Sequence, residues 1–265
     1  MNKPSRPKVV VINSASVDGR IAVSPDILLL YGDERWRAIE EWSNVRELGS
    51  AFEWLKLIHR PQATLEGSGS FVREDDQAEP LPRFDGDAES LCQDFLPCDV
   101  VDRPEHQGWF TAVDGRGRVR GWIKNGSAFG EDMAGWYLLV LVGRHTPPEY
   151  LAYLRRENIP YLVAGEGSVD LRLALEKMRS KLGVTCVLST AGGKLNGALL
   201  RARLVDEINV ELLPAVIGGH ETPSLFDAPT LTPGEWPTRL ELMSAQVQVG
   251  GRVWLRYRVV REKNV

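Results

Sequence analysis

Residues 187–197, VLSTAGGKLNG, contain the feature that decides the fold: an apolar strand ends in a glycine pair and passes directly into a helix. Glycine at both Gly192 and Gly193 permits a tight turn in which backbone N–H groups are exposed. Two explanations are open for this turn. It either binds a phosphate at the helix N-terminus, or it needs glycine only for close packing.

Strands and helices alternate on both sides of this turn. Apolar runs, most of them rich in β-branched residues, predict strands at 8–14, 63–66, 136–142, 161–164, 184–189 and 208–213. Apolar residues at helical spacing, or a Thr-Pro-Pro-Glu capping box, predict helices within 36–55, from Thr146 to Glu157, and at 171–182 and 195–203. The tail predicts a hairpin of 245–249 and 253–259 around Gly250-Gly251. The pattern is typical of a three-layer α/β fold with a mostly parallel mixed sheet and a C-terminal hairpin.

One long stretch differs in composition from the rest. Residues 72–103 hold ten acidic and three basic side chains, and four prolines fall between Pro80 and Pro104. Two short strands are expected after it, at 109–113 and 119–123, joined by a hairpin turn at 114–117. We therefore expect a single domain over residues 1–265 with an acidic, proline-containing insertion at about 72–136.

Composition and charge exclude several classes of protein. The net charge is −4 and the pI is about 5.7, which argues against nucleic acid as a partner. The longest apolar run, Tyr137–Val142, is far shorter than the ~20 residues that a membrane span needs. The polar start lacks a signal peptide, and three irregularly spaced cysteines are typical of a reduced, cytoplasmic protein.

Several catalytic signatures are absent. The sequence has no G-x-S-x-G elbow and no zinc-deaminase motif, and Gly193-Lys194 is followed by leucine, so there is no Walker A motif. Cys92, Cys98 and His106 lie close together in the sequence, but their spacing does not match known zinc sites. No metal is expected.

A second glycine loop follows another predicted strand. Glu66-Gly67-Ser68-Gly69-Ser70 is small and exposes its backbone, although neither glycine loop spells the dinucleotide fingerprint G-x-G-x-x-G. Ligands of open α/β sheets bind at the carboxyl ends of the strands. Two such loops at that edge favour a nucleotide site there.

Three stretches resemble the riboflavin-biosynthesis pyrimidine reductases, which have a dihydrofolate-reductase-like fold. Ser16-Val17-Asp18-Gly19-Arg20-Ile21-Ala22 is similar to the opening of that family, and Gly67–Ser70 is similar to its G-A-G-T loop. Residues 190–207, TAGGKLNGALLRARLVDE, match its E-G-G-G-T-L-N-G-A-L-L-R-A-G-L-V-D-E, and a P-x-x-x-G-G motif follows at 214–219. The resemblance covers about a third of the chain.

The resemblance implies an NADPH-dependent reductase that transfers hydride to the sugar C1 of a ribosylaminopyrimidine phosphate. It also implies a homodimer, in agreement with the exposed edge expected for the C-terminal hairpin. The cofactor is expected to contact Gly67, Ser68, Gly69, Ser70, Ala191, Gly192, Gly193, Lys194 and Leu195. The substrate is expected to contact Ser16, Asp18, Glu74 and Thr190.

Arg144 is a further candidate cofactor-binding residue, and it is inferred from its position in the sequence rather than from the resemblance. It follows the strand at 136–142 and directly precedes a helix, where a cation could bind the 2′-phosphate of NADPH. The alternative is that Arg144 only pairs with a nearby carboxylate on the surface.

The sequence also departs from the family. Thr190 stands where the family has glutamate, the acidic motif after the G-A-G-T loop is blurred into Glu74-Asp75-Asp76, and no sugar-phosphate arginine follows. Two alternatives therefore stay open: a reductase of the same fold that acts on another heterocycle or carbonyl, and a nucleotide-binding protein without catalytic activity.

Overall fold

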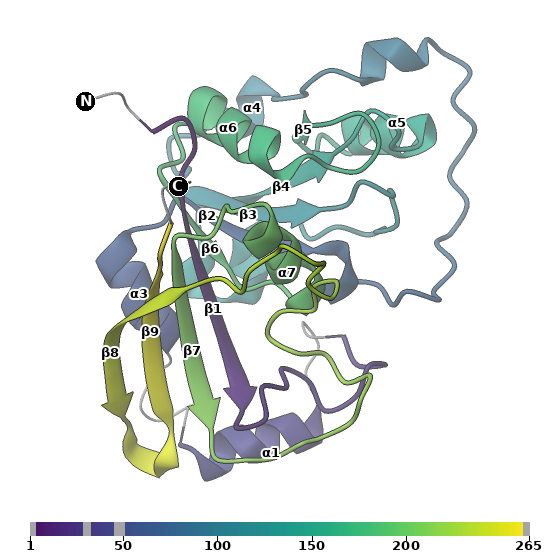
Figure 1. Cartoon of the computed structure of the whole chain (residues 1–265). Helices are drawn as coiled ribbons and strands as arrows, with labels where there is room; N and C mark the ends of the chain where they lie inside the picture. Colours follow the sequence, from purple (N-terminus) through teal and green to yellow (C-terminus); the bar gives the residue numbers. More distant parts are fainter. Residues whose placement is uncertain (1–3, 29–32, 45–50, 262–265) are drawn as a thin grey trace. The chain divides into compact units, whose positions relative to one another are not determined.

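The structure, a computed structural model, describes residues 4–28, 33–44 and 51–261 (Figure 1). The chain forms two compact units, and each is built from two separate parts of the sequence. The first unit contains Pro61–Val187 and the segment before Lys8, and the second contains Lys8–Arg60 and Leu188–Val265.

The sheet of the first unit has four parallel strands in the order β5-β4-β3-β2. Strand β6 (Cys186–Ser189) spans the boundary to the second unit. The elements of the first unit are β2 (Ala63–Gly67), η1 (Ser68–Ser70), η2 (Ala88–Leu91), α4 (Cys98–Val101), β3 (Gly108–Val113), η3 (Gly126–Phe129), η4 (Glu131–Met133), β4 (Trp136–Val142), α5 (Pro148–Arg156), β5 (Tyr161–Val163) and α6 (Leu171–Leu182).

Strand β4 is the centre of the core in this unit. All seven of its residues are buried, which agrees with the continuous apolar run in the sequence. Leu138, Val140 and Val142 alternate along the strand and pack in one hydrophobic cluster with Tyr150 and Leu151 of α5. A strand of this kind has to be covered on both faces, so its carboxyl end is held rigidly at the edge of the sheet.

The hairpin predicted after β3 is wrong. Asp114, which is fully buried at the end of β3, accepts hydrogen bonds from the backbone N–H groups of Arg118 and Val119, both at 2.9 Å. Its carboxylate also accepts the Tyr150 hydroxyl at 2.8 Å. These bonds turn the chain away from the sheet, and residues 119–123 form no strand.

The predicted insertion contains one strand of the sheet. β3 lies inside residues 72–136 and pairs in parallel with both β2 and β4. The acidic part before β3 is mostly irregular, but it is attached to the sheet by Phe95, whose N–H and C=O exchange hydrogen bonds with Tyr161 at 2.9 Å. This contact covers the outer strand β5, whose edge would otherwise be exposed.

The start of α5 differs from the predicted capping box. The N-cap residue is Pro147, and α5 begins at Pro148. The hydroxyl of Thr146 instead accepts the N–H of Gly143 at 3.0 Å and donates to the carbonyl of Gly115 at 2.8 Å. Thr146 therefore joins two loops at the edge of the sheet rather than capping the helix.

The second unit has the strand order β1-β7-β9-β8. β1 and β7 are parallel, with Ser16 opposite Leu213 at their carboxyl ends, whereas β9 is antiparallel to both of its neighbours. Besides β6, the elements of the second unit are β1 (Lys8–Ser16), α1 (Glu34–Trp42), α3 (Ala51–His59), α7 (Gly193–Arg201), β7 (Glu207–Leu213), β8 (Leu240–Val247), η5 (Val249–Gly251) and β9 (Val253–Val259).

Most elements predicted here are confirmed, with shifted ends. The C-terminal hairpin is present, but β8 begins at Leu240, five residues before the predicted start. Of the helical stretch expected within 36–55, the described residues form α1 and α3, whereas residues 45–50, which include the possible helix breaker Gly49, lie outside the described part of the chain. Asp33 caps α1 by accepting the N–H of Arg35 at 2.8 Å.

Candidate functional site

The turn at Gly67–Ser70 lies at the carboxyl end of β2 in the first unit. Ser68–Ser70 form one turn of 3₁₀ helix, and the buried Ser70 hydroxyl donates to the carboxylate of Glu66 at 2.8 Å. A side chain added at Gly69 would meet no atom within 4 Å. The turn is therefore fixed by its own hydrogen bonds and has open space in front of its central glycine.

The loops that follow β4 and β5 lie against each other at the same edge. A Cβ on Gly143 would come within 2.8 Å of the carbonyl oxygen of Gly167, so the two backbones approach closely only because Gly143 has no side chain. The N–H of Arg144 donates to the carbonyl of Gly165 at 3.0 Å. Gly165 itself has φ +89°, a conformation that favours glycine.

Arg144 lies in this loop and is paired with two carboxylates. Its guanidinium contacts Glu89 at 2.5 Å and Glu166 at 3.3 Å. The hydrogen bond that Arg144 donates to Glu89 is the largest cause that raises the pKa of Arg144, and the charges of Glu89 and Glu166 raise it further. The structure thus shows the surface pairing that was the alternative for this residue, and its role toward a 2′-phosphate stays a prediction.

Glu74 lies on an exposed turn of the first unit. Its carboxylate pairs with Arg116, at 3.4 Å, in the loop that follows β3. The turn is closed by Asp76, which accepts the N–H of Arg73 at 2.8 Å. Glu74 is therefore near the carboxyl end of β3, and its contact with substrate stays a prediction.

In the second unit, a buried amide network holds the turn after β6. The side-chain N–H groups of Asn196 donate to the carbonyl of Ala191 at 2.7 Å and to Asn13 Oδ1 at 2.9 Å. Asn196 Oδ1 accepts the Ser189 hydroxyl at 2.7 Å. Sequence reasoning missed Asn13 and Asn196, although an asparagine inside an apolar strand and another at a buried position of a helix were the available signal.

Gly193 is crowded by its own chain. A Cβ at this position would lie well inside contact distance of the carbonyl oxygen of Ser224 and the carboxylate of Asp227. The carbonyl of Gly193 also accepts the N–H of Asp227 at 3.0 Å. Close packing therefore explains this glycine, whereas Gly192 is the extended N-cap residue of α7.

The other predicted residues of this turn differ in exposure. Ala191 is fully buried, Thr190 and Leu195 are half-buried, and Lys194 is exposed. They all lie within six residues of sequence at the carboxyl end of β6 and the start of α7. Their contacts with a cofactor or substrate stay predictions.

Asp18 connects the turn after β1 with the loop after β7. Its carboxylate accepts the Ser16 hydroxyl at 2.6 Å and the backbone N–H groups of Ile217 and Gly218 at 3.1 and 2.7 Å. The bond from Ser16, followed by those from Ile217 and Gly218, lowers the pKa of Asp18 to about 2. Asp18 is therefore ionised at neutral pH and cannot donate a proton to a substrate.

The chemistry available at these loops is binding and orientation rather than acid–base catalysis. Ser16 is buried and uses its hydroxyl on Asp18, and both oxygens of Asp18 are engaged by the loop of residues 214–219. Within the described part of the chain, no cluster of three or more His, Cys, Asp or Glu side chains could hold a metal ion. No helix among residues 4–28, 33–44 and 51–261 is long and apolar enough to cross a membrane.

Comparisons with known proteins agree with the motifs. Residues 131–254 match the RibD C-terminal domain. A curated protein of Methanothermobacter thermautotrophicus, named 2,5-diamino-6-ribosylamino-4(3H)-pyrimidinone 5′-phosphate reductase, is 35% identical over 101 residues, which cover 38% of this chain and 46% of that protein. The match thus spans less than half the length of that relative.

Solved structures show the same fold at low sequence identity. A pyrimidine reductase-like protein of Corynebacterium diphtheriae has a TM-score of 0.60 at 16% identity, covering 97% of this chain and 93% of the other. RibD of Acinetobacter baumannii has a TM-score of 0.55 at 18% identity, covering 97% of this chain and 59% of the other. The predicted α/β fold class is confirmed, and so is the resemblance of this chain to the RibD-type pyrimidine reductases.

Proposed function

We propose that this protein is a nicotinamide-dependent reductase that uses NADPH to reduce a ribosylaminopyrimidine 5′-phosphate at the sugar C1. The observation that carries the proposal is the 35% identity to a protein named as a reductase of that kind of substrate. The match covers 38% of this chain. The geometry of the loops at the carboxyl ends of the strands supports the assignment of the cofactor.

The first unit fits a nucleotide phosphate better than the turn at Gly193 does. The open space in front of Gly69 leaves room for a ligand against the backbone, whereas the corresponding space at Gly193 is filled by Ser224 and Asp227. We therefore assign the phosphates of the cofactor first to Gly67–Ser70. Arg144 is the cation for the 2′-phosphate, and the paired Glu89 and Glu166 would have to release it.

The bound nicotinamide supplies a hydride. In the reduction this hydride adds to the sugar C1, the bond from C1 to the ring oxygen breaks, and a proton joins that oxygen, which leaves an open ribityl chain. The residues of this chain contribute by orientation. Asp18 keeps the loop of residues 214–219 in place, and since its carboxylate is already ionised, the proton comes from another group or from water.

Two pyrimidines are candidate substrates. The relative's named substrate is a diaminopyrimidinone, whereas the riboflavin-type reductase that the motifs resemble acts on the corresponding aminouracil; the two pyrimidines differ at one exocyclic position. Thr190 stands where the resembling family has an acid, and this favours a second candidate, a reductase of the same fold for another heterocycle or carbonyl.

We also propose a homodimer in the cytoplasm. β8 is the outer strand of its unit, and Leu242, Met243 and Val247 on it are exposed. Exposed apolar edge strands are usually paired or covered. Light scattering should give a mass of about twice 29.6 kDa, and a mass near 29.6 kDa at micromolar concentration would contradict the dimer. The three free cysteines agree with a reducing compartment.

The activity is tested by following NADPH absorbance after addition of either pyrimidine to the purified protein. The proposal predicts steady consumption of NADPH with one of the two phosphates and none with the free riboside lacking the phosphate. Binding of NADPH without consumption, with both pyrimidines present, would favour a nucleotide-binding protein without catalytic activity.

A further inference from the structure

A pocket of about 300 Å³ lies in the first unit at the amino end of β4, opposite to the end that leads into Gly143 and Arg144. Its floor includes Tyr137 and Leu138, the first residues of β4 after Trp136. Gly143, at the carboxyl end, is six residues further along this extended strand, which is roughly 20 Å at about 3.3 Å per residue. The pocket is thus separate from the loops to which the cofactor is assigned.

The floor of the pocket is apolar and rigid. Val100 of α4, Leu138 of β4, and Ile159 in the turn after α5 are nearly fully buried and form it together with Pro160 and the ring of Tyr137. Small-molecule sites typically have volumes of roughly 300–1,000 Å³ and combine an apolar lining with a few placed polar groups. The size and the floor of this pocket fit a compact ligand.

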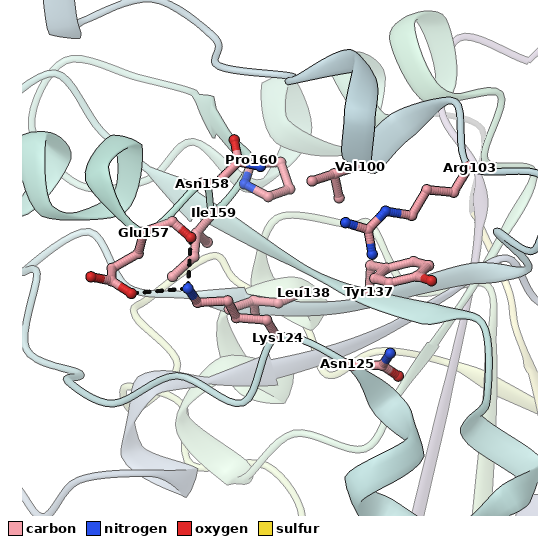
Figure 2. A pocket seen from close by; sticks show the side chains of 10 residues that line it. All are labelled: Val100, Arg103, Lys124, Asn125, Tyr137, Leu138, Glu157, Asn158, Ile159 and Pro160. Atoms are coloured by element: carbon pink, nitrogen blue, oxygen red, sulfur yellow. Dashed lines mark hydrogen bonds and ion pairs between the residues drawn. The ribbon is translucent and has the colours of Figure 1, made fainter.

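Two cations stand on different sides of this floor. Figure 2 shows the guanidinium of Arg103 over the Tyr137 ring on one side and the pair of Lys124 with Glu157 on the other. Arg103 is held by its stack on Tyr137, at 4.7 Å from the ring centre, and by a hydrogen bond from Nε to the Asp99 carbonyl at 2.6 Å. The guanidinium is therefore pre-oriented beside the pocket.

Lys124 is held just as firmly. Its Nζ donates to the carbonyl of Glu157 at 2.7 Å and to the carboxylate of the same residue at 2.9 Å. Since an ammonium group has three donors, one N–H is left to point elsewhere. Asn125 adds a neutral donor, because its Oδ1 accepts both the N–H and the hydroxyl of Ser127 and its NH₂ group remains for other contacts.

Two acidic side chains near Arg103 lie outside the lining and accept hydrogen bonds from neutral groups. Asp99 accepts the amide of Asn158 at 2.7 Å, and Glu105 accepts the Tyr137 hydroxyl at 3.0 Å. Neither carboxylate lines the pocket, whereas Glu157 does and is paired with Lys124. The charged lining is thus two cations and one anion, an excess of one positive charge.

We propose that this pocket is a second ligand site, for a small molecule that carries one phosphate or carboxylate on a compact apolar or aromatic body. The anionic group lies between Arg103 and Lys124, and the body lies on the apolar floor. Arginine and lysine that are already held in place bind an anion with little further loss of side-chain entropy. The inference is independent of the proposed reductase activity, because it uses none of the residues of the candidate site.

The test is isothermal titration of the full-length protein with phenyl phosphate, compared with phenol and with inorganic phosphate. We expect saturable binding of phenyl phosphate that is tighter than that of either fragment and unaffected by NADPH at saturation. Arg103→Gln and Lys124→Gln should each weaken it roughly tenfold or more, because each removes a charged hydrogen-bond partner. Arg83→Gln, an exposed arginine of the same unit, should bind like the wild type.

Several results would overturn the proposal. Absence of saturable binding, equal binding by wild type and Arg103→Gln, or displacement by NADPH would each remove the second site. Phenol or inorganic phosphate binding as tightly as phenyl phosphate would contradict the ligand class. Melting temperatures of all variants verify that they are folded, and Arg103→Gln alone decides the outcome if Lys124→Gln does not fold.

Discussion

The carboxylate of Asp18 accepts the backbone N–H of Gly218 at 2.7 Å, across 200 residues of sequence. A second N–H, that of Ile217, donates to the same carboxylate at 3.1 Å. Gly218 has φ +74°, so the loop adopts here a backbone conformation that other residues rarely take. Asp18 thus holds the loop after β7, and the substrate contact that the motif implies for it stays a prediction.

Asp18→Asn should therefore lower stability in a pH-dependent way. The pKa of Asp18 is depressed in the folded protein, from an ordinary value of 3.8 to about 2. A depressed carboxyl pKa contributes stability above the unfolded value, and this contribution is lost as the pH falls through the folded value. The difference in melting temperature between wild type and variant should be constant at neutral pH and shrink between about pH 4 and pH 2.

Asp26→Asn is the matched control for this experiment. Asp26 is an exposed aspartate in the same part of the second unit, and its backbone, not its carboxylate, is what contacts Ser24. Its variant should melt like the wild type at every pH. If the difference in melting temperature between wild type and Asp18→Asn is the same at neutral and acidic pH, the role of the charged carboxylate is contradicted.

The sequence predicts an element correctly where a local residue pattern alone determines that element. The continuous apolar run at 136–142 coincides with β4, because a strand covered on both faces needs apolar residues at every position. α6 ends at Leu182, which is the predicted end of the helix at 171–182, and the next residue, Gly183, has φ +68° and donates its N–H to the carbonyl of Met178. Both features depend only on residues close to one another in the chain.

The predictions of a hairpin after β3 and of a capping box at Thr146 are wrong because partners distant in the sequence bind these residues. The turn at 114–117 has the composition of a hairpin, but Asp114 is bound by Tyr150, which lies 36 residues later. Thr146 has the spacing of a capping box, yet its hydroxyl donates to the carbonyl of Gly115, which lies 31 residues earlier. The crowding of Gly193 by Asp227 and the pairing of Arg144 with Glu89 are also long-range contacts, and the roles of Gly193 and Arg144 toward a cofactor stay predictions.

Two glycine substitutions distinguish packing from binding. Gly193→Ala should destabilise the protein by about 1–3 kcal/mol, the usual cost of overpacking, because its Cβ would collide with Ser224 and Asp227. Gly69→Ala should leave stability nearly unchanged, since the space there is open, but weaken NADPH binding. Urea unfolding and cofactor titration measure the two effects. The opposite pattern, a stable Gly193→Ala and a destabilised Gly69→Ala, would contradict the assignment.

The carboxylates paired with Arg144 should weaken the binding of NADPH. If Arg144 binds the 2′-phosphate, Arg144→Ala should weaken NADPH binding by roughly 1.5–3 kcal/mol and leave NADH binding nearly unchanged. Glu89→Gln should strengthen NADPH binding. The substitution frees the guanidinium from an ion pair of 2.5 Å and removes a negative charge from its vicinity. The measurement is the pair of dissociation constants for each variant. Equal changes for NADPH and NADH would exclude Arg144 from the 2′-phosphate site.

The buried ion pair of Arg252 with Glu211 should matter for folding alone. The two side chains are 2% and 3% exposed and 2.5 Å apart, and Glu211 also accepts the Ser14 hydroxyl at 2.9 Å. Arg252→Met leaves a buried carboxylate without its cation and should cost about 3–5 kcal/mol. The double variant Arg252→Met, Glu211→Met should recover most of this loss in urea unfolding. A single variant as stable as the wild type would show that the pair contributes nothing.

The most direct test of the central claim is the position of the transferred hydride. The protein is incubated with NADPH that carries deuterium at both hydrogen positions of C4 of the nicotinamide and with the diaminopyrimidinone or aminouracil ribosyl phosphate, and the product is analysed by mass spectrometry and NMR. The account predicts a ribityl product with one deuterium, located at C1 of the former sugar. A product without deuterium, deuterium on the pyrimidine ring, or no product from either compound would contradict it.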